Sequence, residues 1–139
     1  MYLIDTNVVS ELRRHEAGRA HPRVAAWARN VKAAGMYLAA HTIFELELGV
    51  RLMERRDEFQ ASILRNWLRE RVLSGFAGRI LPADQNVALR CAALHVPVTR
   101  PERDAWIAAT ALVHGMIVVT RNVADFEPMG VAVVNPWDF

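Results

Sequence analysis

Five short, mainly apolar runs, separated by longer stretches with helical periodicity, constrain the fold of this chain most strongly. The runs lack the alternation of polar and apolar residues typical of a strand with one face in water. Continuous apolar runs are typical of strands buried on both faces, as in parallel sheets covered by helices. The five expected strands are Met1–Ile4, Met36–Ala40, Arg79–Leu81, Met116–Thr120 and Val131–Val134.

The stretches between these runs predict helices, because their apolar residues recur at helical spacing. Thr6 or Asn7 can cap the first helix, Pro22 can open the second and Gly35 can end it. The expected helices are Val8–Arg14, Pro22–Gly35, Ile43–Met53, part of Glu54–Arg71, Asp84–Val96 and Glu102–His114. We therefore expect one α/β domain over residues 1–139, a three-layer α/β/α sandwich with a mostly parallel sheet of four to five strands.

Composition excludes several other classes of protein. A chain with 53% hydrophobic residues and a net charge of +2 is unlike a disordered one. Cys91 is the single cysteine, so an internal disulfide is excluded. No apolar run reaches the roughly 18–20 residues that cross a bilayer, and Asp5 interrupts any leader-like N-terminus. These features predict a soluble cytoplasmic protein without a membrane partner.

Four acidic residues lie near the ends of the expected strands or in the helix starts that follow them. These acids are Asp5, Glu45, Asp104 and Asp125. Each acid alone is as typical of a helix cap or turn as of a metal ligand. The carboxyl ends of parallel strands, however, meet at one edge of the sheet, so we expect the four acids to lie close together there. Crowded carboxylates raise one another's pKa, and a divalent cation relieves that cost. Oxygen ligands without clustered His or Cys suit Mg²⁺ or Mn²⁺.

Neighbouring residues could support such a site. Thr6, Asn7, Thr120 and Asn122 could add hydrogen bonds to the ligands, to water or to a phosphate. Glu45 and Glu47 project about 200° apart on a helix, so one of the two should face the strand ends. Carboxylate–metal sites of this kind polarise a phosphoryl oxygen and activate water for attack.

At these residues the chain resembles the PIN-domain ribonucleases, specifically the VapC/FitB-type toxins of bacterial toxin–antitoxin modules. Four motifs carry the resemblance in the same order, and the ending Val134–Trp137 fits as well. The motifs are Tyr2–Asn7, Thr42–Gly49, Asp104–Ala111 and Thr120–Phe126. They cover nearly the whole chain, without a departure at an acidic position.

The resemblance implies a reaction, a cofactor and partners. Asp5 and Asp104 would contact one or two Mg²⁺ or Mn²⁺ ions, Glu45 would bind metal or position water, and Asp125 would act mostly through water. The implied reaction is the hydrolysis of RNA phosphodiester bonds. The implied partners are a second copy of the chain and a VapB/FitA-like antitoxin, whose C-terminal segment places a basic side chain in the acidic pocket.

Two alternatives differ in class. A phosphoacceptor signalling domain also gathers acids around Mg²⁺, but it needs a lysine after a late strand, and Lys32 in an early helix is the only lysine. A non-enzymatic RNA- or antitoxin-binding module would keep the fold without turnover, and intact acids do not exclude it.

Arginine accounts for nearly all of the positive charge and suits a polyanionic partner. Setting the four acids aside leaves eleven acids against 17 basic residues, an excess of six positive charges. Arg55, Arg56 and Arg121 are the candidate RNA contacts, although the arginines of the Arg51–Arg71 stretch are more typical of a solvated, salt-bridged face. Among the histidines, only His41 is expected close to the acids, beside Glu45.

Overall fold

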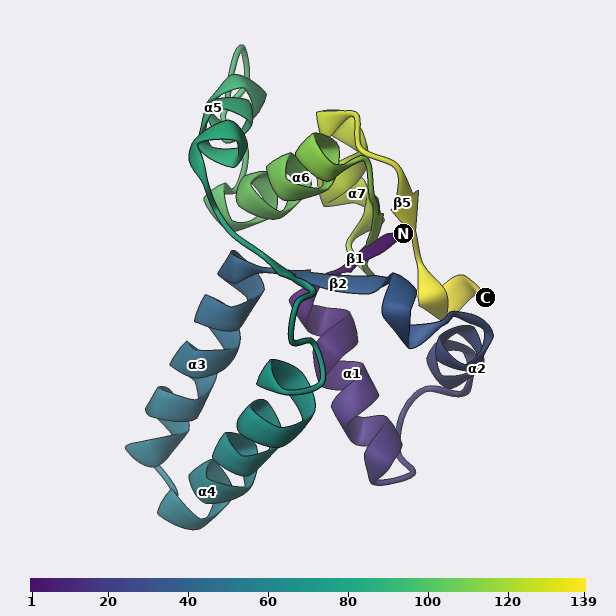
Figure 1. Ribbon diagram of the computed structural model, residues 1–139, viewed down its shortest axis with the longest axis vertical. Coiled ribbons are helices and arrows are strands. Elements are labelled where there is room, and N and C mark those ends of the chain that lie inside the picture. The colour runs from purple at the N-terminus through teal and green to yellow at the C-terminus, as the bar shows by residue number, and fades with distance from the viewer.

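The computed structural model describes residues 1–139 and contains a five-stranded parallel sheet (Figure 1). The strands lie in the order β3-β2-β1-β4-β5, and every neighbouring pair is parallel. Their bounds are β1 Tyr2–Ile4, β2 Met36–Ala39, β3 Ile80–Leu81, β4 Ile117–Val119 and β5 Val133–Val134. All five predicted strands are therefore present, each shorter at one or both ends than the apolar run that predicts it.

Helices cover both faces of the sheet. One face carries α1 (Thr6–Glu16), α2 (Pro22–Asn30), α3 (Ala40–Glu54) and α4 (Glu58–Trp67), and the other carries α5 (Gln85–Leu94), α6 (Glu102–His114) and α7 (Val123–Phe126) (Figure 1). Consecutive strand residues serve opposite layers: Leu3 packs in the cluster with α5 and α6, and Ile4 packs in the cluster with α1, α2 and α3. None of the helices has the length and apolar character that a membrane span requires.

Several helical segments differ from the sequence-based expectation. α1 begins at Thr6, because the Asp5 side chain accepts a hydrogen bond from the first backbone N–H and caps the helix. α2 ends at Asn30, since β-branched Val31 is extended, and a separate 3₁₀ turn covers Ala33–Gly35. The charge-rich stretch after α3 forms α4 and then wider π-helical turns over Leu68–Leu73.

The strand order creates a switch point between β1 and β4. From β1 the chain moves to β2 and β3 on one side, and it then returns to the other side for β4 and β5. In such sheets the crevice for a ligand lies beyond the carboxyl ends of the strands where the order reverses. Asp5 directly follows β1 and Thr120 directly follows β4, so both lie at this crevice.

Candidate active site

Asp5 is a fully buried carboxylate at the switch point. Its Oδ1 accepts a hydrogen bond from the Thr6 backbone N–H at 2.7 Å, and its Oδ2 accepts one from the Thr120 hydroxyl at 2.8 Å. The Asn7 side-chain amide donates to the same Oδ2 at 3.3 Å. Burial raises the pKa of Asp5 above its ordinary value, although the hydrogen bonds from Thr120 and Thr6 oppose that rise.

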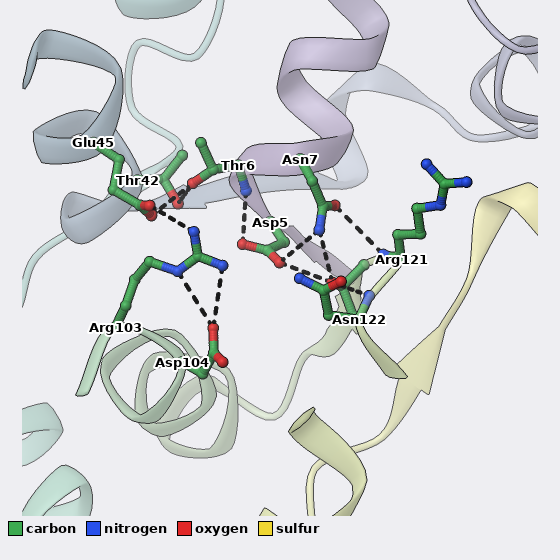
Figure 2. A network of polar contacts seen from close by, with 10 residues as sticks. Asp5, Thr6, Asn7, Thr42, Glu45, Arg103, Asp104, Arg121 and Asn122 are labelled. Atoms are coloured by element: carbon green, nitrogen blue, oxygen red, sulfur yellow. Dashed lines mark hydrogen bonds and ion pairs between the residues drawn. The ribbon is translucent and has the colours of Figure 1, made fainter. Parts of the chain in front are cut away.

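The predicted supporting residues form one polar network around Asp5 (Figure 2). The buried Thr120 hydroxyl accepts from the Asn122 backbone N–H at 3.0 Å and from the Asn7 amide at 3.3 Å. The Asn7 side-chain oxygen accepts from the Arg121 backbone N–H at 3.4 Å. These contacts join the end of β4 to the start of α1, so the two ends that flank the crevice are fixed relative to each other.

Glu45 and Asp104 face the same space from two other helices, and Arg103 lies between them (Figure 2). Glu45, on α3, accepts from the Thr6 hydroxyl at 2.8 Å and from Nη1 of Arg103 at 2.9 Å. Asp104, on α6, accepts at Oδ1 from Nη2 and Nε of Arg103 at 3.3 and 3.4 Å. The guanidinium of Arg103 therefore bridges the two carboxylates.

The pKa values reflect this crowding of charge. Burial raises the pKa of Asp104, Arg103 opposes the rise, and the charges of Asp125 and Glu45 add to it. Burial lowers the pKa of Arg103, but Glu45, Asp5 and Asp104 together raise it on balance. The positive charge of Arg103 thus offsets part of the repulsion among three carboxylates.

Asp125 differs from the other three acids. It lies exposed in the first turn of α7, and its side chain makes no hydrogen bond or ion pair, although its charge acts on Asp104. No three His, Cys, Asp or Glu side chains lie close enough together to hold a metal ion. The structure therefore groups Asp5, Glu45 and Asp104 around Arg103 and places Asp125 at the rim. The sequence instead predicts all four acids around a metal.

Comparison with known families identifies this arrangement. The family model described as "PIN domain" matches residues 2–128, which is most of the chain. The chain belongs to the PIN-domain family. The resemblance seen in the sequence motifs is thereby confirmed.

Individual relatives place this PIN domain near the VapC and FitB proteins. It is 38% identical to VapC ribonuclease Y4jK of Sinorhizobium fredii and 38% identical to toxin FitB of Neisseria gonorrhoeae, each over 99% of both chains. The crystal structure of FitAcB from Neisseria gonorrhoeae matches with a TM-score of 0.90 at 38% identity over 100% of both chains. This match confirms the predicted α/β fold.

The donor set of the PIN domain fits a divalent cation in its chemistry. All candidate ligands are carboxylate oxygens, which Mg²⁺ and Mn²⁺ prefer. Asp5 and Asp104 are buried with raised pKa values, and a nearby cation offsets the cost of burying such charges. In the structure Arg103 supplies the positive charge to Glu45 and Asp104.

Arg103 and Thr42 belong to the site although no sequence pattern singles them out. A basic residue in the first turn of a helix is unfavourable to the helix dipole, so Arg103 beside Asp104 is a signal for an acidic neighbour elsewhere. Thr42 is fully buried one turn before Glu45, and its hydroxyl oxygen lies 3.4 Å from that of Thr6. The spacing of three residues on α3 could have indicated a shared face.

The candidate RNA-binding arginines lie at different distances from the acids. Arg55 and Arg56 are exposed beyond the far end of α3, about 15 Å along the helix axis from Glu45. Arg121 follows Thr120 at the crevice, and its guanidinium lies over the Trp137 ring, 5.1 Å from the ring centre. Only Arg121 of the three is therefore adjacent to the polar network.

An open, mainly apolar hollow of about 380 Å³ is lined in part by residues of α3 and α6, the helices that carry Glu45 and Asp104. Its lining residues are Ala40, His41, Phe44, Ala83 and Trp106. The hollow shares α3 and α6 with the site, since Phe44 precedes Glu45 and Trp106 lies two residues after Asp104.

Proposed function

We propose that this PIN domain is a Mg²⁺- or Mn²⁺-dependent endoribonuclease that acts in the cytoplasm as the toxin of a toxin–antitoxin module. The observation that carries the proposal is the pair of buried carboxylates, Asp5 and Asp104, held with Glu45 at the switch point of the sheet. Membership of the PIN family and the 38% identity to a VapC ribonuclease support the same reaction, hydrolysis of RNA phosphodiester bonds.

Each polar residue has a role in this proposal. Asp5 and Asp104 would hold the cation, whose chemistry when bound is polarisation of a phosphoryl oxygen and activation of water. Thr120 and the Thr6 backbone N–H fix the two oxygens of Asp5, and the Thr6 hydroxyl holds Glu45, which would bind the cation or position water. Asp125, exposed at the rim, would contribute mostly through water.

The surroundings of the acids suit a single-stranded polyanion. The excess of arginine outside the site attracts phosphates, and among the three candidate RNA contacts only Arg121 has its backbone in the polar network. Phe44, Trp106 and His41 offer aromatic surfaces in the adjoining hollow, on which an RNA base can stack beside the reacting phosphate.

We also propose a homodimer and a VapB/FitA-like antitoxin as partners. The solved relatives support the antitoxin partner, since they include a VapBC complex of Salmonella typhimurium bound to DNA and FitAB of Neisseria gonorrhoeae bound to a DNA fragment. The chain itself supports inhibition by a basic side chain, because Glu45 and Asp104 already accept hydrogen bonds from a guanidinium.

Cleavage of defined RNAs with Mg²⁺ or Mn²⁺ tests the proposal. We expect cleavage that stops with EDTA, and we expect Asp5→Asn and Asp104→Asn to lose it while keeping the far-ultraviolet circular dichroism spectrum. Asp138→Asn is the matched control, because Asp138 is exposed and forms no ion pair. Cleavage that continues in EDTA, or in both site variants, would contradict the proposal. RNA binding without cleavage at any metal concentration would favour the non-enzymatic binding module.

A further inference from the structure

Arg103 is the only cationic side chain that forms ion pairs with the grouped acids, and it pairs with two of them, Glu45 and Asp104 (Figure 2). The side chains of Glu45 and Asp104 are 17% and 6% exposed, whereas that of Arg103 is 41% exposed. The guanidinium therefore reaches from the solvent side into a largely buried acidic space.

The acids are also the only partners that hold this guanidinium. Its hydrogen bonds go to Glu45 and Asp104 alone. Arg79 is different, because its guanidinium donates to the backbone carbonyls of Ala33, Met36 and Gly75 and so links three segments. Displacing Arg103 would break no other hydrogen bond of its guanidinium, so the side chain can turn to solvent without unlinking other segments of the chain.

We propose that Arg103 is a positioning residue that holds Glu45 and Asp104 together and competes with the divalent cation for their oxygens. The inference rests on the proposed function, since it concerns the metal affinity of the same site. Arg103 occupies one oxygen of each carboxylate, Oε2 of Glu45 and Oδ1 of Asp104, so a cation that binds both residues meets the charge of the guanidinium and competes with it for these oxygens. Arg103 therefore sets the divalent-cation concentration at which the site fills.

Calorimetric titration of the full chain with Mn²⁺ tests this competition. If the guanidinium occupies the acids about nine-tenths of the time, Arg103→Gln should bind Mn²⁺ about tenfold more tightly than the unaltered chain. Arg90→Gln is the matched control, because it removes the same charge from an exposed residue of α5 without an ion pair. We expect its Mn²⁺ affinity to stay within about twofold of the original, because exposed charges are screened by salt.

Two further measurements separate competition from a merely structural role. Arg103→Lys keeps the charge but cannot bridge two carboxylates as a guanidinium does, so its Mn²⁺ affinity should lie between those of the unaltered chain and Arg103→Gln. In EDTA, Arg103→Gln should melt at a lower temperature than the unaltered chain, and Mn²⁺ should raise its melting temperature by more. If Arg103 had a merely structural role, Arg103→Gln would melt at a lower temperature in EDTA, but Mn²⁺ would not raise its melting temperature by more than that of the unaltered chain.

The outcomes distinguish the inference from the function on which it rests. If the unaltered chain binds Mn²⁺ and the Arg103→Gln and Arg103→Lys variants bind it equally or more weakly, the competition is overturned and the proposed function stands. An equal gain in affinity for Arg90→Gln would also overturn it, since net charge would then explain the effect. If none of the proteins binds Mn²⁺, the metal dependence in the proposed function is itself overturned.

Discussion

Asp5 belongs to the fold and to the candidate site at once. Its Oδ1 caps α1 through the Thr6 backbone N–H, and its Oδ2 faces the hydroxyl of Thr120. A change at Asp5 therefore alters a helix cap together with a candidate ligand. Thr120 gives a cleaner test of the site, because its side chain contacts Asp5 and does not cap a helix by itself.

Thr120→Val should lower both RNA cleavage and stability. Loss of a hydrogen bond that orients a metal ligand typically lowers activity or metal affinity about 10–100-fold. The Asn122 N–H and one oxygen of Asp5 would also lose a partner, at a cost of about 1–3 kcal/mol in the free energy of unfolding. Cleavage rates and urea unfolding measure the two effects.

Thr110→Val provides the control for this prediction. Thr110 is a buried threonine like Thr120, with an exposed fraction of 2%. Its hydroxyl, however, donates to the Trp106 carbonyl within α6 and makes no hydrogen bond to the acids. We expect little change in cleavage rate, whatever the change in stability. An equal loss of cleavage in the two variants would show that Thr120 acts through general packing and not through Asp5.

At the scale of residues, the sequence predicts the acids of the site but not the arginine that lies among them. Asp5 can be found because it lies between an apolar run and a helix, and Asp104 because it lies in the first turn of a helix. Arg103 cannot be assigned in the same way, since a guanidinium on a long side chain has many reachable partners. Glu45 is reached from α6 only because the sheet brings α3 and α6 to one edge.

At the scale of elements, α3 shows how one helix serves two surfaces. Glu45 faces the strand ends, while Glu47 accepts hydrogen bonds from Arg51 on α3 and from Arg65 on α4. The hydrogen bond from Arg65 is the main cause that lowers the pKa of Glu47 to about 2. The expectation that only one of the two acids faces the site is confirmed, and the other links α3 to α4.

The segment after α4 depends on a close backbone approach at Gly75. The π-helical turns bury Leu68 and Val72, and the chain then passes so near Arg71 that a Cβ on Gly75 would collide with the Arg71 carbonyl oxygen. Gly75→Ala should therefore lower the free energy of unfolding by about 1–3 kcal/mol. Urea unfolding followed by circular dichroism measures this loss.

Gly49→Ala is the opposite case. Gly49 lies inside α3, and a Cβ there would meet nothing within 4 Å. Alanine is the better helix former, so this variant should raise the free energy of unfolding by about 0.5–1 kcal/mol. Equal effects at the two positions would contradict the backbone clash at Gly75.

The sequence predicts most elements, because buried strands and amphipathic helices leave periodic patterns. It does not predict the π-helical turns or α7. Leu68 and Val72 are four residues apart and would fit an ordinary helix, so the wider turns depend on how both pack against the sheet. α7 covers only Val123–Phe126, too short to show a period.

At the scale of the whole molecule, the small net charge conceals two fields of opposite sign. Three acids are grouped at the switch point, and the remaining surface carries an excess of arginine. Part of that excess is neutralised locally, since Arg51, Arg65 and Arg71 pair with glutamates. The positive field available to a polyanion therefore depends on arginines outside these pairs, such as Arg55, Arg56 and Arg121.

Among the three candidate RNA contacts, Arg121 should matter most. It adjoins Asn7 and Thr120, whereas Arg55 and Arg56 lie beyond the far end of α3. For single strands, each phosphate contact contributes about 0.7 to the slope of log affinity against log salt. Arg121→Gln should therefore reduce this slope by about 0.7, and Arg55→Gln and Arg56→Gln should leave it unchanged.

Fluorescence anisotropy with a labelled single-stranded RNA measures these slopes, in an Asp104→Asn background so that the RNA stays intact. Arg121 also lies over the Trp137 ring, so loss of packing at Trp137 could weaken binding by itself. Such a loss would lower affinity equally at all salt concentrations, whereas loss of a phosphate contact changes the slope. A reduced slope for Arg55→Gln or Arg56→Gln but not for Arg121→Gln would instead direct the RNA along α3 and α4, away from the crevice.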